Sequence, residues 1–149
     1  MARSTQPQAD CETVMNFGLP LAAEILKRNG EFLPFGAAMR PNREIVCLGA
    51  YDGRSYPSLI GSFAELIRSL KEALVEGARR HEYVATALFY EVGFTPPAGG
   101  EDVDAVAVSL NHRDGYSVIV LLPYKIEGGE VVYDIPRAQP GEADIFPSR

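Results

Sequence analysis

The sequence contains a β-hairpin pattern, from residue 103 to residue 126, that is apolar on both of its faces. The first predicted strand, Val103–His112, alternates between two sets of side chains: Val106, Val108 and Leu110 against Ala105, Ala107 and Ser109. After the turn Arg113-Asp114-Gly115, the second strand opposes Val118, Val120 and Leu122 to Ile119 and Leu121. A sheet with one wet face alternates apolar with polar residues instead. We therefore expect both faces to be covered, by helices or by a second copy of the protein.

Two helices and further strands accompany this hairpin. Helical spacing of apolar residues predicts a first helix that Asp10 caps, Asn29-Gly30 ends, and Pro20 kinks or divides. A second helix, the clearest in the chain, runs to about Arg80 and presents one apolar face: Leu59, Phe63, Leu66, Ile67, Leu70, Leu74 and Gly77. The remaining predicted strands are Phe32–Met39, Glu44–Tyr51, Tyr83–Thr95 and the short Glu130–Ile135.

The order of elements is α-β-β-α-β-β-β, followed by the short additional strand. Consecutive strands joined by tight turns pair antiparallel. The prediction is an α+β domain whose five-stranded, or with the extra strand six-stranded, antiparallel sheet carries two main helices, with the last main strand beside the first. This order resembles the profilin-like and Roadblock/longin group of folds. Those families end in a helix, where this chain has a proline-rich tail with Pro136, Pro140 and Pro147.

Two stretches of sequence also resemble a family of small bacterial proteins of unassigned function. The first is Phe32-Leu33-Pro34-Phe35-Gly36-Ala37-Ala38 with Glu44-Ile45. The second runs from Val108 through Asn111-His112-Arg113-Asp114-Gly115 and includes Leu122-Pro123-Tyr124. The resemblance implies a bacterial protein and brings no activity with it.

Size and charge narrow the class of protein. A chain of 149 residues ordinarily forms one domain; we assign residues 1–9 to a disordered leader, 10–135 to the domain and 136–149 to the tail. The net charge of −6 resides entirely in residues 76–149, which carry 6 basic and 12 acidic side chains. A nucleic-acid partner would require a basic patch, and none is visible. With no secretory signal or membrane-spanning stretch, the expected location is the cytoplasm.

Candidate catalytic groups are sparse. The two cysteines, Cys11 and Cys47, form no metal-binding motif with the two histidines, so we expect neither a metal nor a cofactor. His112 could pair with Asp114 and activate Ser109 or Cys47, but no nucleophile motif surrounds it. The leading expectation is therefore a protein that is not an enzyme.

Two surfaces are candidates for binding. The first would take a ligand or partner through a proline-interrupted aromatic strand and a polar loop: Phe32, Pro34, Phe35, Tyr51, Asp52, Arg54 and Tyr56. The second is a dimer face made of Phe89, Ala105, Ala107, Ile119 and Leu121, where small residues admit close approach. A folded tail could cover that face instead. The leading hypothesis is a homodimeric interaction module, adaptor or regulator; the alternatives are a small-ligand sensor and an antitoxin or immunity-like protein with an acidic surface.

Overall fold

The computed structural model describes residues 6–49, 63–94, 99–100 and 103–147. Its elements confirm an α+β fold with two helices and an antiparallel sheet. In chain order they are α1 (Gln6–Asn29), β1 (Phe35–Met39), β2 (Ile45–Leu48), α2 (Phe63–Arg79), β3 (Ala85–Phe94), β4 (Val103–His112), β5 (Ser117–Glu127), β6 (Glu130–Tyr133) and β7 (Arg137–Pro140).

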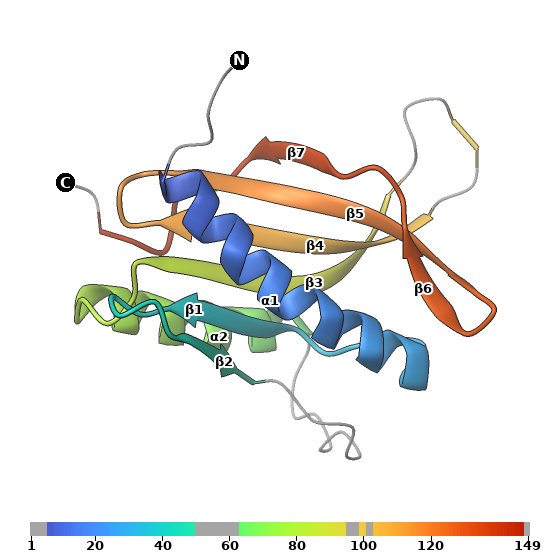
Figure 1. Cartoon of the computed structure of the whole chain (residues 1–149), viewed down its shortest axis with the longest axis horizontal. Helices are drawn as coiled ribbons and strands as arrows, with labels where there is room; N and C mark the ends of the chain where they lie inside the picture. Colours follow the sequence, from blue (N-terminus) through green and yellow to red (C-terminus); the bar gives the residue numbers. More distant parts are fainter. Residues whose placement is uncertain (1–5, 50–62, 95–98, 101–102, 148–149) are drawn as a thin grey trace.

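The strands form one open sheet in the order β2-β1-β3-β4-β5-β6, and β7 also pairs with β5 (Figure 1). The expectation that the last main strand lies beside the first is wrong, because β3 pairs with β1 from Phe35↔Phe89 to Met39↔Ala85. The profilin-like and Roadblock resemblance is accordingly not confirmed. β6 and β7 follow one another along the outer side of β5, and the Asp134 amide still donates to the Pro123 carbonyl at 2.7 Å. This returning chain occupies the edge of β5 that the expected order assigns to the first strand.

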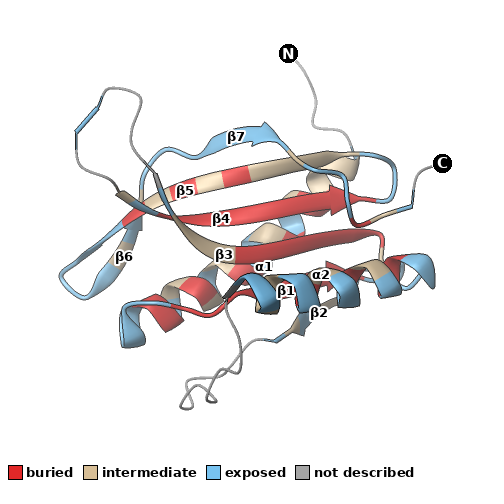
Figure 2. Ribbon diagram, turned by 180° about the vertical axis from the view of Figure 1, so that it is seen from behind, coloured by how far each residue is buried: buried red, intermediate tan, exposed pale blue. Residues whose placement is uncertain are grey.

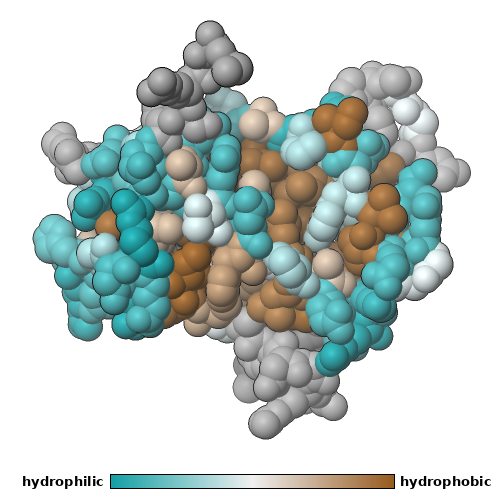
Figure 3. Space-filling view, in the orientation of Figure 1, coloured by the Kyte–Doolittle hydropathy of each residue, from teal (hydrophilic) through white to brown (hydrophobic). Residues whose placement is uncertain are grey.

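Helix α1 covers one face of the sheet, which we call the first face (Figure 1). Its buried stripe is Asp10, Cys11, Val14, Gly18, Ala22, Ile25 and Leu26. Beneath it lie side chains from all the central strands, including Phe35, Phe89, Val108, Leu110 and Val120. Gly18 permits the closest approach, since a Cβ there would lie 2.2 Å from the Phe89 ring. Seen from outside in Figure 3, hydrophobic side chains are visible across the middle of this face and hydrophilic ones gather at its ends.

Helix α2 packs on the opposite, second face of the sheet, against β1 and β3. Leu70, Leu74 and Ala78 of α2 form a separate core cluster with Ala38 and Leu88. The helix ends in a Schellman motif: Glu82 N donates to the Gly77 carbonyl at 2.9 Å, and His81 takes the left-handed conformation with φ 60°. Seen from behind in Figure 2, β4 and β5 have no helix in front of them. Helix α1 therefore covers the central strands of the first face, and α2 covers part of the second.

Helix α1 differs from expectation at its start and at Pro20. Helix α1 already begins at Gln6, so residues 6–9 are helical rather than part of a leader, and it continues through Pro20 without a second start. The Asn16 carbonyl, four residues before Pro20, lies at an exposed position where water can satisfy it. The glycine stop is confirmed, because the Gly30 amide donates to the Leu26 carbonyl at 2.8 Å with φ 74°.

The tail is ordered against the domain. After β7, the Gly141 amide donates to the Ser117 carbonyl at 3.1 Å, and the chain crosses to the second face. There Lys71 of α2 bonds Asp144 at 2.8 Å and Glu142 at 3.3 Å. Ile145 is buried in the cluster under α2. The tail thus covers the part of the second face next to α2. Pairing with β5 brings the chain to this place, and Lys71 binds its acidic residues.

Candidate functional site

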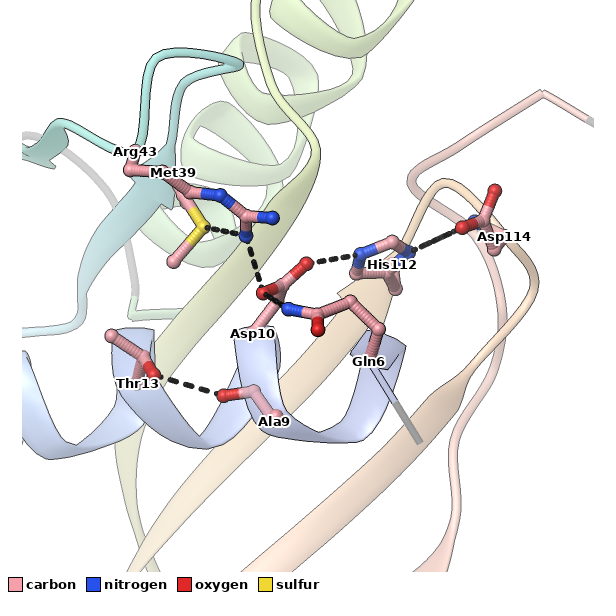
Figure 4. A network of polar contacts seen from close by, with 8 residues as sticks. All are labelled: Gln6, Ala9, Asp10, Thr13, Met39, Arg43, His112 and Asp114. Carbon is pink, nitrogen blue, oxygen red and sulfur yellow. Dashed lines mark hydrogen bonds and ion pairs between the residues drawn. The ribbon is translucent and has the colours of Figure 1, made fainter. Parts of the chain in front are cut away.

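A network of charged side chains joins the N-terminal part of α1 to two turns of the sheet (Figure 4). Asp10 is buried, and its Oδ2 lies 2.9 Å from Nε2 of His112, which is also buried. The other carboxylate oxygen accepts from Gln6 at 2.6 Å and from the Arg43 guanidinium. The prediction that Asp10 caps the helix is wrong. Asp10 lies within the first turns, at the head of the buried stripe, and bonds across to the sheet.

Arg43 reaches this network from the turn between β1 and β2. The turn is closed by the Arg43 amide donating to the Arg40 carbonyl and the Arg40 amide donating to the Glu44 carbonyl, both at 2.8 Å. Arg43 has φ 74°, a conformation that costs a residue with a side chain about 1 kcal/mol. A glycine would avoid this strain but would lack the guanidinium. Here the strained position places a positive charge beside Asp10.

The electrostatics of Asp10 follow from these contacts. Burial raises the pKa of Asp10, but hydrogen bonds from His112, Gln6 and Arg43 and the positive charge of Arg43 lower it. The net result is a pKa below the ordinary value of 3.8, so the carboxylate is ionised at neutral pH. A buried carboxylate with this set of donors stabilises the contact between α1 and the sheet.

The orientation of the His112 ring decides its chemistry. The Asp114 amide donates to Nδ1 at 3.0 Å, so Nδ1 is an acceptor and the neutral ring carries its proton on Nε2, toward Asp10. A catalytic histidine bonded to a carboxylate presents its second nitrogen to a nucleophile. Here a backbone amide occupies that nitrogen, and Asp114 Oδ2 lies 3.7 Å from it. In this geometry His112 holds two elements together and has no nitrogen left to act as a base.

The proposed nucleophiles do not meet His112. Ser109 lies on the opposite face of β4, because residues an odd number apart in a strand point to opposite faces. Cys11 follows Asp10 in α1, but burial, together with the charges of Asp10 and Glu12, raises the pKa of its thiol to about 12. Cys47 is exposed on β2, and its pKa is also raised by desolvation. Both cysteines are therefore thiols, and poor nucleophiles, at neutral pH.

A cavity of about 290 Å³ lies next to the β4–β5 turn, between residues 111–117 and the tail residues Ala143, Phe146 and Pro147. Its polar groups bind one another: the Ser117 hydroxyl donates to Asn111 Oδ1 at 2.8 Å and accepts from the Ala143 amide at 3.0 Å. The nearby Thr86 hydroxyl is buried and has no partner among the described residues. Within the described ranges, no three metal-ligating side chains come together.

The residues of the first predicted surface, the one for a ligand or partner, have two outcomes: some are buried in the core, and the others lie outside the described residues. Phe32, Pro34 and Phe35 are buried, and Phe35 stacks on Phe89 with ring centroids 4.6 Å apart. Phe32 and Phe35 belong to the core cluster under α1 rather than line a pocket beside α2. Tyr51, Asp52, Arg54 and Tyr56 lie outside the described residues.

The second predicted surface is largely one face, with one exception. Ala107 pairs with Leu121 and Ser109 with Ile119, so Ala105, Ala107, Ile119 and Leu121 share the second face. Phe89 does not, because it pairs with Val108 and is buried under α1. In its place Tyr90 and Val92 of β3 lie beside Ala107 and Ala105.

These residues form an apolar patch, which we call the β4 trough because small residues of β4 lie between larger ones. At its centre are Ala105 and Ala107, which are 0% exposed because the side chains around them cover them. Its walls are half-buried apolar residues of the two neighbouring strands and of β4 itself: Tyr90, Val92, Val103, Ile119, Leu121 and Pro123. Among the described elements, α2 and the tail cover the second face beside this trough but leave the larger side chains around Ala105 and Ala107 partly exposed.

Fold and site together define an α+β protein with an open antiparallel sheet, a network that links the buried Asp10–His112 pair to the exposed Arg43, and an apolar trough. Comparison with family models, curated proteins and solved structures finds no match to the chain. The resemblance to a small bacterial family therefore stays a prediction. No helix in the described part of the chain is long and apolar enough to cross a membrane.

Proposed function

We propose that the protein is a non-enzymatic interaction module that acts as a homodimer, with the β4 trough as the surface that meets the second copy. The observation that carries the proposal is the pattern of small residues flanked by larger half-buried ones on a part of the sheet that lies beyond α2. Ala105 and Ala107 are 0% exposed, so a partner would rest on the half-buried side chains around them, among them Leu121 and Tyr90.

The hydrogen bonding of His112 supports a non-enzymatic role. Among the described residues, the buried Asp10–His112 pair has catalytic potential, but both nitrogens of the His112 ring are hydrogen-bonded within the fold. The apolar trough, by contrast, keeps surface that water contacts in the single chain. Removing such surface from water favours association.

Sedimentation of the full chain tests the proposal. We expect a dimer at about 50 μM, and a monomer for Leu121→Lys, because the charge would lie within the interface while its aliphatic stem still packs on the sheet. The control is Asn16→Lys, which adds the same charge at an exposed position of α1 on the opposite face. Circular dichroism establishes that both variants fold. A wild-type chain that sediments as a monomer up to about 100 μM would show the proposal to be wrong.

A further inference from the structure

The second face of the sheet becomes polar at the end nearest the β4–β5 turn. Because alternate residues of a strand share a face, β4 continues from Ala107 to Ser109 and Asn111 on this face, and Asn111 pairs with Ser117 of β5. Asn111 and Ser117 line the cavity of about 290 Å³ between the turn and the tail. This cavity is therefore a polar site at the opposite end of β4 from Val103.

The buried side chain of Asn111 has a hydrogen-bond donor that no described residue uses. Asn111 is 3% exposed. Its Oδ1 accepts from the Ser117 hydroxyl at 2.8 Å, and that hydroxyl accepts in turn from the Ala143 amide at 3.0 Å. The other end of the carboxamide, Nδ2, carries two N–H groups and has no hydrogen bond within the described part of the chain.

This donor of Asn111 faces the cavity. Among the described residues, the Thr86 hydroxyl is the only fully enclosed polar side-chain atom without a partner. Nδ2 of Asn111 is therefore in contact with the open space of the cavity that Asn111 lines. A buried donor without a partner is unfavourable, so a ligand atom that accepts from Nδ2 gains binding free energy.

The turn supplies one positive and one negative charge to the cavity walls. Arg113 is exposed, and its guanidinium has no ion pair or hydrogen bond with the part of the chain that the structure describes. Asp114 follows it, with Oδ2 at 3.7 Å from Nδ1 of His112. A guanidinium binds a carboxylate through two parallel hydrogen bonds. Because Asp114 repels anions, a ligand with a single negative charge fits these walls better than phosphate does.

The tail supplies apolar walls. Phe146 is half-buried and Pro147 is exposed, and both line the cavity. Gly141 lets the tail pass close to β5, because a Cβ there would collide with the Ser117 hydroxyl. The volume of about 290 Å³ is at the small end of the range for ligand sites. The cavity therefore suits a molecule with a small apolar body, such as one ring.

We propose that this cavity binds a small organic monocarboxylate. The carboxylate accepts a hydrogen bond from Nδ2 of Asn111 and pairs with the guanidinium of Arg113, while the apolar body lies against Phe146 and Pro147. The binding is reversible and includes no covalent step. This inference goes beyond the proposed homodimer, because every residue that lines the cavity belongs to a single chain.

Benzoate is the first probe, since it joins one carboxylate to one ring. Titration of the isotope-labelled full chain, followed by NMR, is expected to give a Kd of about 1 mM and to shift the side-chain amide signals of Asn111. Benzamide has nearly the same shape without the charge and is the matched control; it is expected to bind about tenfold more weakly. Acetate tests the carboxylate without the ring, and inorganic phosphate is expected to bind more weakly than benzoate.

A charge-removing variant tests the role of the turn. Arg113→Gln changes an exposed side chain and is expected to raise the Kd for benzoate about tenfold. Lys125→Gln removes a positive charge toward the other end of β5 and should leave the Kd unchanged. Circular dichroism establishes that both variants fold.

Several results would overturn the carboxylate site. One is the absence of binding by both benzoate and acetate at about 20 mM. Others are a titration that leaves the Asn111 amide signals in place, a Kd that Arg113→Gln does not change, and phosphate or benzamide binding as tightly as benzoate. None of these results bears on the proposed dimer, which sedimentation without any ligand tests separately.

Discussion

The close approach of α1 to the sheet at Gly18 gives the sharpest test of the structure. A Cβ at this position would lie 2.2 Å from Phe89 Cζ. An ordinary contact between carbon atoms is about 3.5 Å, so the ring would have to retreat by the difference, about 1.3 Å. Phe89 is fully buried and stacked on Phe35 with centroids 4.6 Å apart. Because the ring is 0% exposed and enclosed by the core, either the ring or α1 would have to shift at the expense of other contacts.

The expected magnitude is the sum of two opposing effects of Gly18→Ala. Forcing an extra carbon into a packed core costs about 1–3 kcal/mol. Replacing glycine by alanine within a helix favours folding by about 1 kcal/mol. We therefore expect a net loss of about 1 kcal/mol in the free energy of unfolding. In a Phe89→Leu background the ring is absent, so the same substitution should stabilise the protein by up to about 1 kcal/mol.

Equilibrium urea unfolding of the four proteins, followed by circular dichroism, measures this change of sign. The coupling free energy between the two positions is expected to be about 2 kcal/mol. Asn16→Ala, on the exposed side of α1, is the control and should have the same effect in both backgrounds. If Gly18→Ala has the same effect with and without the Phe89 ring, α1 does not rest on Phe89 as described.

Three further predictions concern the buried polar groups. Asp10→Asn should lower the free energy of unfolding by about 2 kcal/mol at pH 7. Because the folded-state pKa of Asp10 is lowered, its carboxylate stabilises the fold above about pH 4. The difference between wild type and Asp10→Asn in urea unfolding should therefore shrink as the pH falls toward 3. Thr86→Val should stabilise by about 1 kcal/mol in the same assay, because it removes a buried hydroxyl that lacks a partner among the described residues, and a loss would indicate a bond in solution. Iodoacetamide at pH 8 should label Cys47 and spare Cys11, whose pKa is raised to about 12, until urea is added; mass spectrometry reads both sites, and rapid native labelling of Cys11 would contradict its burial.

Sequence reasoning predicted the elements better than their arrangement. The strand Val103–His112 has the bounds predicted for it, because its alternation is strict and a glycine turn follows. β7 was missed, since Arg-Ala-Gln-Pro shows no alternation and gains its order from pairing with β5. Alternation within a strand does not reveal its register with the next one, and a slip of one residue turns every side chain to the other face. For this reason Phe89 was assigned to the wrong face.

The Asp10–His112 contact was also missed, although each half left a signal in the sequence. Asp10 precedes Val14, Gly18 and Ala22 at intervals of four, so it continues the stripe that α1 buries. His112 follows Val106, Val108 and Leu110 at intervals of two, so it shares their buried face. A polar residue on a predicted apolar face needs a partner. Sequence alone shows that need, but the choice of partner across 102 positions depends on the packing of α1 on the sheet.

That separation also has a consequence for the growing polypeptide. A ribosome that adds about 5–20 residues per second completes β4 about 5–20 seconds after Asp10, since 102 positions separate Asp10 from His112. Until then α1 lacks the side chains of β4 and β5 that complete its packing, Val108, Leu110 and Val120 among them, and part of its apolar stripe faces the solvent. A chaperone that binds nascent apolar helices would therefore encounter α1 first. It would have to release α1 before the helix can pack on the sheet.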